Sequence, residues 1–375
     1  GFASYDAPCA PGPIPYGECN DGGDNDVTSR FCPFLELIPS LEDSLAGANG
    51  VAFADFNGDG RGDILTGSES GGAVRLYNQL SSGGFASPAT LSVTAAVRVL
   101  RTGPLFDDPA STVDDAIDDL VVVNGSSGQV TAVCNGSTGA AATSAVLPTV
   151  VMGARDAVVV RVNASAHAVA YISPLQGNLY LAETIGPFAP RCTSLAFDPN
   201  TLAIGAVSPT AITGGRFLTR GTAVEDIVVI TTTGDAFLFA NAPAQAGGFQ
   251  LVAAPIATGL TGALSATAGD FNGDGRLDVV VGTATGAHFI ENTDGTATGF
   301  VASAISGSPV DVVSTSASDI NLDGRDDLIT ASSSADSVDW WERVGTGWLR
   351  HSLVSDFNGA RAAVAGDVDA DGDLD

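Results

Sequence analysis

Aspartates recur in one spacing at four places in the sequence, and the spacing suits calcium. The pattern D-x-D/N-x-D-G-x-x-D begins at Asp55, Asp270, Asp319 and Asp367. Ca²⁺ takes six to eight oxygen ligands at about 2.3–2.6 Å. Alternate residues of a tight loop point inward, so positions 1, 3 and 5 are expected to converge. Position 7 offers its carbonyl, position 9 a closing carboxylate, and glycine at position 6 permits the turn.

Five candidate ligands follow for each loop, and we expect three to four Ca²⁺ ions because the fourth loop runs to the last residue. The candidates are Asp55, Asn57, Asp59, the Arg61 carbonyl and Asp63; Asp270, Asn272, Asp274, the Arg276 carbonyl and Asp278; Asp319, Asn321, Asp323, the Arg325 carbonyl and Asp327; and Asp367, Asp369, Asp371, the Asp373 carbonyl and Asp375.

A solvated acidic turn is the simpler interpretation of any one copy, because Asp-Gly and Asn-Gly are ordinary turn residues. Four copies in one register favour metal binding. An EF-hand is excluded, because no glutamate stands at position 12. The chain carries 43 acidic and 15 basic residues, a net charge of −28, and bound cations would offset part of it. This charge balance argues against nucleic-acid binding, which needs clustered Lys and Arg.

The acidic loops belong to a longer internal repeat. The closing aspartates Asp278, Asp327 and Asp375 are 49 and 48 residues apart. The wider gap after Asp63 leaves room for three degenerate units, anchored at Asp119 before LVVV, His167 before AVAYI and Asp226 before IVVI. In the second to fourth units the acidic loop is lost, and we predict no calcium there.

Each unit of about 50 residues reads as four short strands, which is typical of a propeller blade. The fold class is therefore all-β: a β-propeller, most simply seven-bladed, with six whole blades and part of a seventh in this chain. Residues 51–375 form the propeller, its last blade truncated. Residues 1–50, rich in Cys, Pro and Gly, form a separate N-terminal segment in which Phe2–Tyr5 or Phe34–Ile38 could supply a closing strand.

Cysteines and sequons indicate an oxidising, secretory environment. Three of the five cysteines lie in the N-terminal segment, where disulfides would compensate for the lack of a core. N-x-S/T sequons occur at Asn124, Asn135 and Asn163, which predicts glycosylation. The sequence has no apolar run long enough to span a membrane and no signal-peptide pattern.

The loops and their flanking strands resemble the FG-GAP/VCBS repeats of the integrin α-subunit propeller. The resemblance is carried by VAFADFNGDGRGDIL, ATAGDFNGDGRLDVV, SASDINLDGRDDLI and VAGDVDADGDLD. It implies a seven-bladed propeller with calcium on one face and a role in adhesion, ligand binding or scaffolding outside the cell.

Three functions stay open from sequence. The first is a calcium-stabilised structural or adhesive module of a larger extracellular or cell-surface glycoprotein, contacting other proteins, further domains or copies of itself. The second is a lectin that binds glycans; Trp340 and Trp341 could form a sugar platform, although at least one is expected to pack between blades. The third is a propeller-scaffold enzyme such as a polysaccharide lyase. No nucleophile elbow, P-loop or zinc motif is present, so we expect no enzyme.

The tripeptide Arg61-Gly62-Asp63 matches an integrin-recognition motif, but its aspartate is a predicted metal ligand.

Overall fold

A computed structural model describes most of the chain from residue 47 onward. The described residues are 47–70, 73–91, 93, 96–105, 118–134, 143–147, 153–163, 166–184, 197–203, 208–220, 224–242, 248–252, 254–355, 358–368 and 374–375. All regular elements in these ranges are β-strands. The proposed closing strands Phe2–Tyr5 and Phe34–Ile38 lie outside them, as do Cys9, Cys19, Cys32 and Cys192.

The strands form six four-stranded antiparallel sheets, one per predicted blade. Blade 1 comprises β1 (Ala48–Ala54), β2 (Asp63–Ser68), β3 (Val74–Tyr77) and β4 (Ala89–Leu91). Blade 2 comprises β5 (Val97–Gly103), β6 (Asp119–Asn124), β7 (Val130–Cys134) and β8 (Thr143–Val146). Blade 3 comprises β9 (Asp156–Asn163), β10 (Ala166–Ser173), β11 (Asn178–Thr184) and β12 (Phe197–Ala203).

The other three blades repeat the same order. Blade 4 comprises β13 (Pro209–Gly215), β14 (Asp226–Thr231), β15 (Ala236–Asn241) and β16 (Phe249–Leu251). Blade 5 comprises β17 (Ala263–Gly269), β18 (Asp278–Thr283), β19 (Gly286–Asn292) and β20 (Phe300–Ala304). Blade 6 comprises β21 (Val312–Ser318), β22 (Asp327–Ser332), β23 (Ser337–Val344) and β24 (Gly347–Val354).

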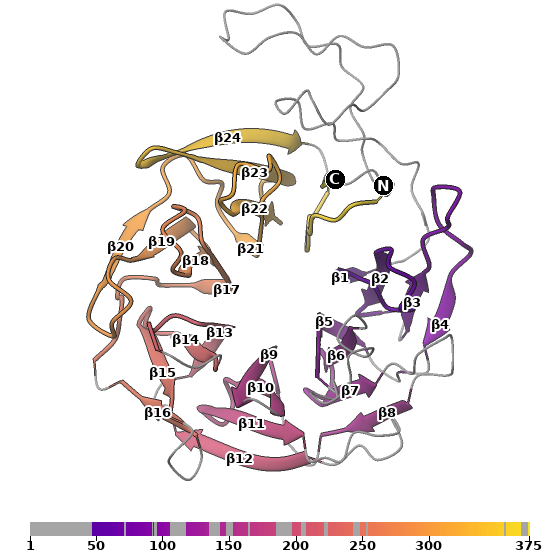
Figure 1. The fold of residues 1–375 in the computed structure, drawn as a ribbon, viewed down its shortest axis with the longest axis horizontal. Coiled ribbons are helices and arrows are strands. Elements are labelled where there is room, and N and C mark those ends of the chain that lie inside the picture. The colour runs from indigo at the N-terminus through magenta and orange to yellow at the C-terminus, as the bar shows by residue number, and fades with distance from the viewer. Residues whose placement is uncertain are drawn as a thin grey trace, which may run out of the picture.

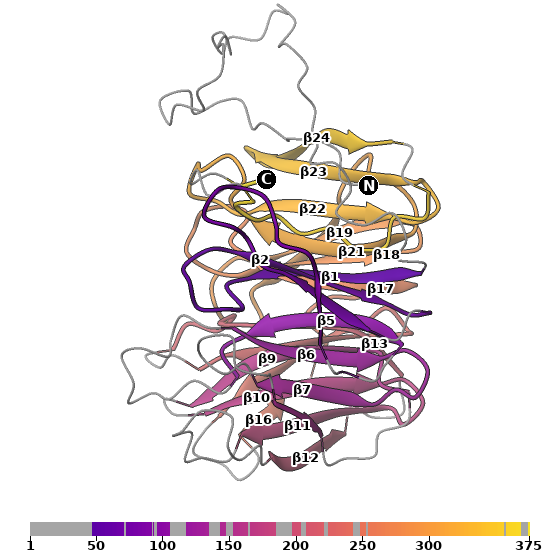
Figure 2. The same ribbon diagram turned by 90° about the vertical axis from the view of Figure 1, so that its right-hand side faces the viewer.

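The six blades are arranged around a central axis, with the first strand of each nearest the axis and the fourth outermost (Figure 1). In the edge-on view β5, β6 and β7 of blade 2 lie below β1 of blade 1 (Figure 2). The predicted β-propeller of four-stranded blades is confirmed.

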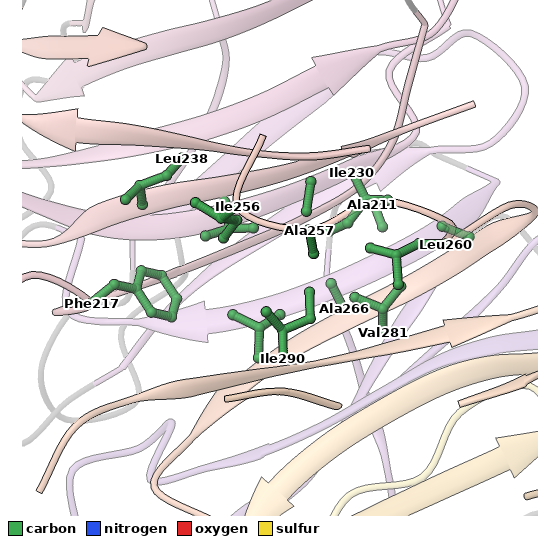
Figure 3. Close-up of a cluster of buried hydrophobic side chains, with 14 residues drawn as sticks. Ala211, Phe217, Ile230, Leu238, Ile256, Ala257, Leu260, Ala266, Val281 and Ile290 are labelled. Atoms are coloured by element: carbon green, nitrogen blue, oxygen red, sulfur yellow. The ribbon is translucent and has the colours of Figure 1, made fainter. Parts of the chain in front are cut away.

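The hydrophobic core lies between the blades. Apolar clusters join blades 1 and 2, 2 and 3, 3 and 4, 4 and 5, and 5 and 6. Figure 3 shows the cluster between blades 4 and 5, where Leu238 and Ile230 face Ile290 and Val281. Second strands are buried on both faces, which explains their continuous apolar runs: every residue of β14, β18 and β22 is buried.

A β-bulge recurs near the start of the first strand in five blades. The pairing register shifts around Asn49, Arg98, Thr210, Leu264 and Val313. In blade 3 the shift lies instead near the end of the first strand, where Val162 of β9 is left out between the pairs Ala166–Asn163 and His167–Arg161. A bulge leaves one residue unpaired and redirects its side chain.

The segment 360–368 lies near the axis between β21 and β1 (Figure 1). Ser316 of blade 6 donates its hydroxyl to the Ala363 carbonyl at 3.0 Å. On the other side, a Cβ on Gly366 would meet the Phe53 ring of blade 1 at 2.3 Å. The segment therefore occupies the place of a seventh inner strand, although it is not itself assigned as a strand. The part of the chain that the structure describes contains no helix that could cross a membrane.

Candidate metal-binding loops

Three of the four acidic loops are described in full, and each joins the first strand of a blade to the second. They connect β1 to β2, β17 to β18 and β21 to β22. The inner strands of a propeller run in the same direction, so these loops share one face of the ring. The fourth loop is described only at Asp367, Val368 and its last two residues; Asp369, Asp371 and Asp373 lie outside the described residues.

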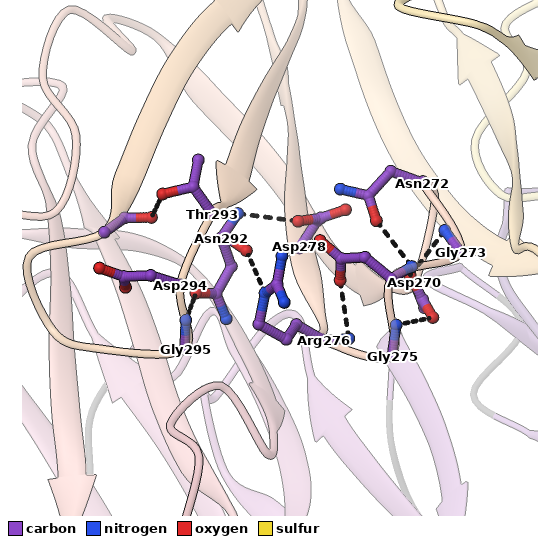
Figure 4. A network of polar contacts seen from close by, with 12 residues as sticks. Asp270, Asn272, Gly273, Gly275, Arg276, Asp278, Asn292, Thr293, Asp294 and Gly295 are labelled. Carbon is purple, nitrogen blue, oxygen red and sulfur yellow. Dashed lines mark hydrogen bonds and ion pairs between the residues drawn. The ribbon is translucent and has the colours of Figure 1, made fainter.

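The first aspartate of each loop accepts backbone N–H groups from the turn that follows it. Asp55 Oδ1 accepts from Gly58 at 2.7 Å and Asp59 at 3.1 Å, and its Oδ2 accepts from Gly60 at 2.8 Å. The second loop repeats these bonds around Asp270 (Figure 4). Asp319 of the third loop accepts from the N–H groups at positions 5 and 6. These bonds fix a tight turn that the D-x-D/N-x-D-G spacing predicts.

The closing aspartates are buried beneath their loops. Asp63 and Asp278 are 0% exposed and Asp327 is 1% exposed. Asp63 accepts from the backbone N–H groups of Phe56 at 3.1 Å and Gln79 at 3.0 Å. Asp278 Oδ1 accepts from the Asn292 N–H at 2.8 Å, while its Oδ2 is buried without a hydrogen-bond partner in the described residues. None of the three makes an ion pair there.

Burial changes the acidity of these carboxyl groups. It raises the pKa of Asp63 to about 6, and those of Asp278 and Asp327 to about 7. The loop's own aspartates add to the effect, since Asp59 and Asp55 further raise the pKa of Asp63. A buried carboxylate with acidic neighbours is costly to ionise unless a cation is close by.

The arginine at position 7 has a second role that the sequence did not reveal. The guanidinium groups of Arg61, Arg276 and Arg325 pair with the position-5 carboxylates of Asp59, Asp274 and Asp323. The recurrence of G-R after D is the sequence signal for this pairing. These pairs offset one charge per loop at the rim, and among the described residues they leave the buried closing carboxylate without an ion pair.

In blades 1, 4 and 5 a buried amide at the end of the third strand ties the blade to the element that precedes it, and this amide was not predicted. The Asn292 side chain donates to the Phe217 carbonyl of blade 4 at 2.7 Å, while its backbone N–H reaches Asp278. Asn241 of blade 4 donates to the Val162 carbonyl of blade 3 at 2.9 Å. Gln79 of blade 1 reaches the carbonyls of Asp367 and Val368. The polar residue closing LYNQ, LFAN and FIEN was the visible signal.

Blade 4 shows how the fold compensates a closing aspartate without an acidic loop. Asp226 is 1% exposed and accepts the N–H groups of Leu218 and Asn241, as its counterparts accept theirs. The Arg220 guanidinium pairs with its carboxylate. A positive group thus occupies the place that the sequence assigns to calcium in other blades.

The donor set of the acidic loops fits a hard divalent cation. Asn57 Oδ1, Asp278 Oδ2 and Asp327 Oδ2 are buried oxygens without a hydrogen-bond partner among described residues. Carboxylate and amide oxygens are ligands that Ca²⁺ prefers. Within the same residues, however, no three acidic, His or Cys side chains converge closely enough to form a metal site. The predicted ligand sets, including the arginine carbonyls, therefore stay predictions.

The fourth loop closes like the first. The backbones of Gly366 and Asp375 exchange two hydrogen bonds of 3.1 and 3.0 Å, and Asp375 Oδ2 accepts from the Val368 N–H at 2.9 Å. Ala54 and Asp63 are paired at the equivalent place, and Phe56 donates to Asp63 there. Asp375 therefore has the same hydrogen-bond arrangement as Asp63, and its role as a metal ligand stays a prediction.

The structure also places the tripeptide, the two tryptophans and the sequons that the sequence singled out. The burial of Asp63 makes an integrin-recognition role for Arg61-Gly62-Asp63 untenable on this surface. Trp340 and Trp341 are 5% and 1% exposed and pack in the clusters on either side of blade 6, so neither offers a sugar platform. The sequons Asn124 and Asn163 end strands β6 and β9; Asn135 lies outside the described residues.

Two family models match the chain, an FG-GAP-like repeat over residues 223–281 and an FG-GAP repeat over residues 262–302. No curated protein sequence is significantly similar to the chain. Among solved structures, the chain is similar to BBS1N in its complex with ARL6DN, with a TM-score of 0.57 and 13% identity over 88% of this chain and 90% of the other. It is also similar to a candidate 6-phosphogluconolactonase from Bacteroides uniformis, with a TM-score of 0.51 and 11% identity over 83% of each chain. These likenesses concern the fold alone.

Proposed function

Because the chain is an FG-GAP repeat β-propeller, we propose that it is a calcium-stabilised, extracellular interaction module of a larger glycoprotein. A propeller of these repeats supports a role in protein interaction in general. In our proposal the module is adhesive or structural, has no catalytic activity, and contacts other extracellular proteins, further domains or copies of itself.

The buried closing carboxylates carry the calcium part of the proposal. Asp63, Asp278 and Asp327 lie on one face, have raised pKa values and lack the arginine that neutralises Asp226. Calcium would be held by these residues together with Asp55, Asp270 and Asp319 and their loops. It would supply the missing positive charge and fasten each loop to its blade. Stabilisation by a bound ion grows with its concentration, by about 2.7 kcal/mol per site at a hundredfold excess over Kd.

Three observations favour an extracellular location. Weak sites of this kind suit the millimolar calcium found outside cells. Cys134 is buried in β7 and disulfide-bonded, as expected in an oxidising compartment. Asn124 and Asn163 lie at strand ends where a glycan could leave the ring.

Binding measurements at two calcium levels test this function. The purified chain, immobilised for interferometry, would be probed with itself and with secreted and cell-surface proteins of its source, in millimolar calcium and in EGTA. We expect saturable protein binding that calcium supports and that the triple variant Asp63→Asn, Asp278→Asn, Asp327→Asn loses. Binding that disappears when the partner is deglycosylated would favour the lectin alternative. Absence of protein binding in calcium, with no effect of EGTA on thermal unfolding, would overturn the proposal.

A further inference from the structure

The axis of the ring is a channel with its own chemistry. It has a volume of about 800 Å³ and is lined by the first strands of the blades and by residues 361–365. Serine and threonine residues of β5, β13, β17 and β21 are among those that line it, including Thr102, Thr213, Ser265 and Ser316. A space of this size accommodates a small organic molecule.

The charge of this channel is opposite to that of the molecule. Among the described residues, four arginines line it, Arg98, Arg101, Arg155 and Arg361, against two acids, Glu69 and Asp156. The whole chain has a net charge of −28. A channel with two excess positive charges inside so acidic a protein attracts anions that the outer surface repels.

Backbone features place the arginines at one end of the channel. Arg98 occupies the β-bulge of β5, the position held by Asn49, Leu264 and Val313 in other blades. Arg155 directly precedes β9, and its backbone N–H donates to the Ile172 carbonyl at 2.9 Å. Arg361 lies near the start of the segment 360–368. All three lie near the starts of inner strands, at the mouth opposite the acidic loops.

The acids do not neutralise these side chains fully. Arg101 pairs with Asp156 at 3.0 Å, where Asp156 is nearly buried. Arg98 lies 4.0 Å from Glu69, whose other oxygen already accepts from Asn49, and the Arg98 Nε is buried without a partner. The guanidinium groups of Arg155 and Arg361 make no hydrogen bond or ion pair with any described residue.

We propose that the channel binds a small polyvalent oxyanion between Arg98 and Arg155, with Arg361 as an additional contact. The ligand class is a small molecule with at least two carboxylate or phosphate groups. Guanidinium groups bind such groups through paired, charge-assisted hydrogen bonds. The pKa of Arg155 is lowered, first by burial and then by the nearby positive charge of Arg98, which an anion between them would relieve.

Calorimetric titration of the purified chain with tricarballylate and with pyrophosphate, at low ionic strength and a monitored free calcium level, tests the proposal. We expect saturable binding of at least one anion near one per chain, weakened by added salt. The double variant Arg98→Gln, Arg155→Gln should weaken anion binding at least about tenfold, because it removes both guanidinium groups that would bind the anion. Arg216→Gln is the control at an exposed position outside the channel. It loses one positive charge, so the single variant Arg155→Gln is its charge-matched counterpart.

The two anions separate a carboxylate ligand from a phosphate ligand. Equal binding by the double variant and Arg216→Gln, or no saturable binding of either anion by the wild-type chain, would overturn the proposal. Binding of a polyglutamate peptide alone would also overturn it, because the ligand would then be an acidic protein segment. If the double variant does not fold, the single variants Arg155→Gln and Arg361→Gln give the same comparison, with thermal unfolding as a check of integrity.

Discussion

The Arg220 guanidinium pairs with the buried carboxylate of Asp226 in blade 4, where no acidic loop is present. The equivalent carboxylates in blades 1, 5 and 6 receive backbone N–H groups but no ion pair from a described residue. A buried carboxylate is destabilising unless it is neutralised. The closing aspartate is thus neutralised in two ways. In blade 4 the cation is the Arg220 side chain, and in blades 1, 5 and 6 we propose that it is a bound calcium ion.

Neutralising the two kinds of closing aspartate should have opposite effects. Without calcium, Asp278→Asn should raise the free energy of unfolding at neutral pH, because it removes a buried charge while keeping the shape. Asp226→Asn should lower it by about 3 kcal/mol, because it leaves Arg220 unpaired. Chemical denaturation in EGTA measures both.

Repeating the denaturation in calcium supplies the control. Asp278→Asn should reduce the stabilisation by calcium, and Asp226→Asn should leave it unchanged. If Asp278→Asn destabilised the chelated chain as much as Asp226→Asn does, the neutralisation argument would be wrong.

The chelated chain should become more stable as the pH falls from 8 to about 5. Asp278 and Asp327 have folded pKa values of about 7, above the ordinary aspartate value of 3.8. The folded state therefore holds these protons more tightly than the unfolded state, and the stability this provides is lost as pH rises through about 7. Thermal unfolding across this range in EGTA checks the sign.

Calcium should flatten this pH dependence, because the ion requires the ionised carboxylates and competes with protons. The variant Asp278→Asn should be less pH-dependent than the wild-type chain in EGTA. A wild-type profile that rises steadily with pH in EGTA would contradict the assignment.

Leu322 has a backbone conformation that favours glycine. Its φ is 55°, and Gly58 and Gly273 hold the same loop position with φ of 74° and 73°. Leu322 is 55% exposed, so little packing is lost on truncation. Leu322→Gly should therefore stabilise the chain by about 0.5–1 kcal/mol. Leu349→Gly, at a 48% exposed position in β24, should destabilise it by a similar amount. Equal effects of the two substitutions in denaturation would refute the strain argument.

Gly366 allows the segment 360–368 to approach blade 1. A Cβ there would meet the Phe53 ring at 2.3 Å, so Gly366→Ala should cost about 1–3 kcal/mol. Gly347→Ala is the matched control, because the nearest atom to its Cβ would be a carbonyl oxygen at 3.7 Å. Hydrogen exchange should show Gly366→Ala loosening the amides of β1 selectively. Unchanged protection there would show that the contact does not hold the ring together.

The blades could be predicted from the sequence because each signal for a strand or turn is local and recurs along the chain. Runs such as LVVV before a turn mark a second strand buried on both faces, and spacings near 50 residues give the unit. Even His167, without an acidic loop, lies in the predicted second strand β10. The tight turns around Asp55, Asp270 and Asp319 followed from the same reasoning.

Contacts between blades could not be predicted, because they depend on how neighbouring sheets are placed. Between blades, nothing near Asn292 in the sequence points to Phe217. Within blade 4, likewise, nothing near Arg220 shows that its side chain reaches Asp226. Arg98 and Arg155 of the channel belong to different blades, and a bulge in pairing register redirects Arg98. Periodicity identifies which face a residue occupies, but it does not determine the partner across a blade interface.

The seam between the segment 360–368 and blade 1 also has a consequence for biosynthesis. Gln79 bonds to carbonyls 288 and 289 residues later in the chain. While the ribosome is still translating the later blades, Phe53 and Gln79 have no such partners, and the first blade keeps one apolar flank exposed. Closure of the ring therefore comes late in synthesis. A chaperone that covers the exposed flank of blade 1 would have to stay bound until residues 360–368 have been translated.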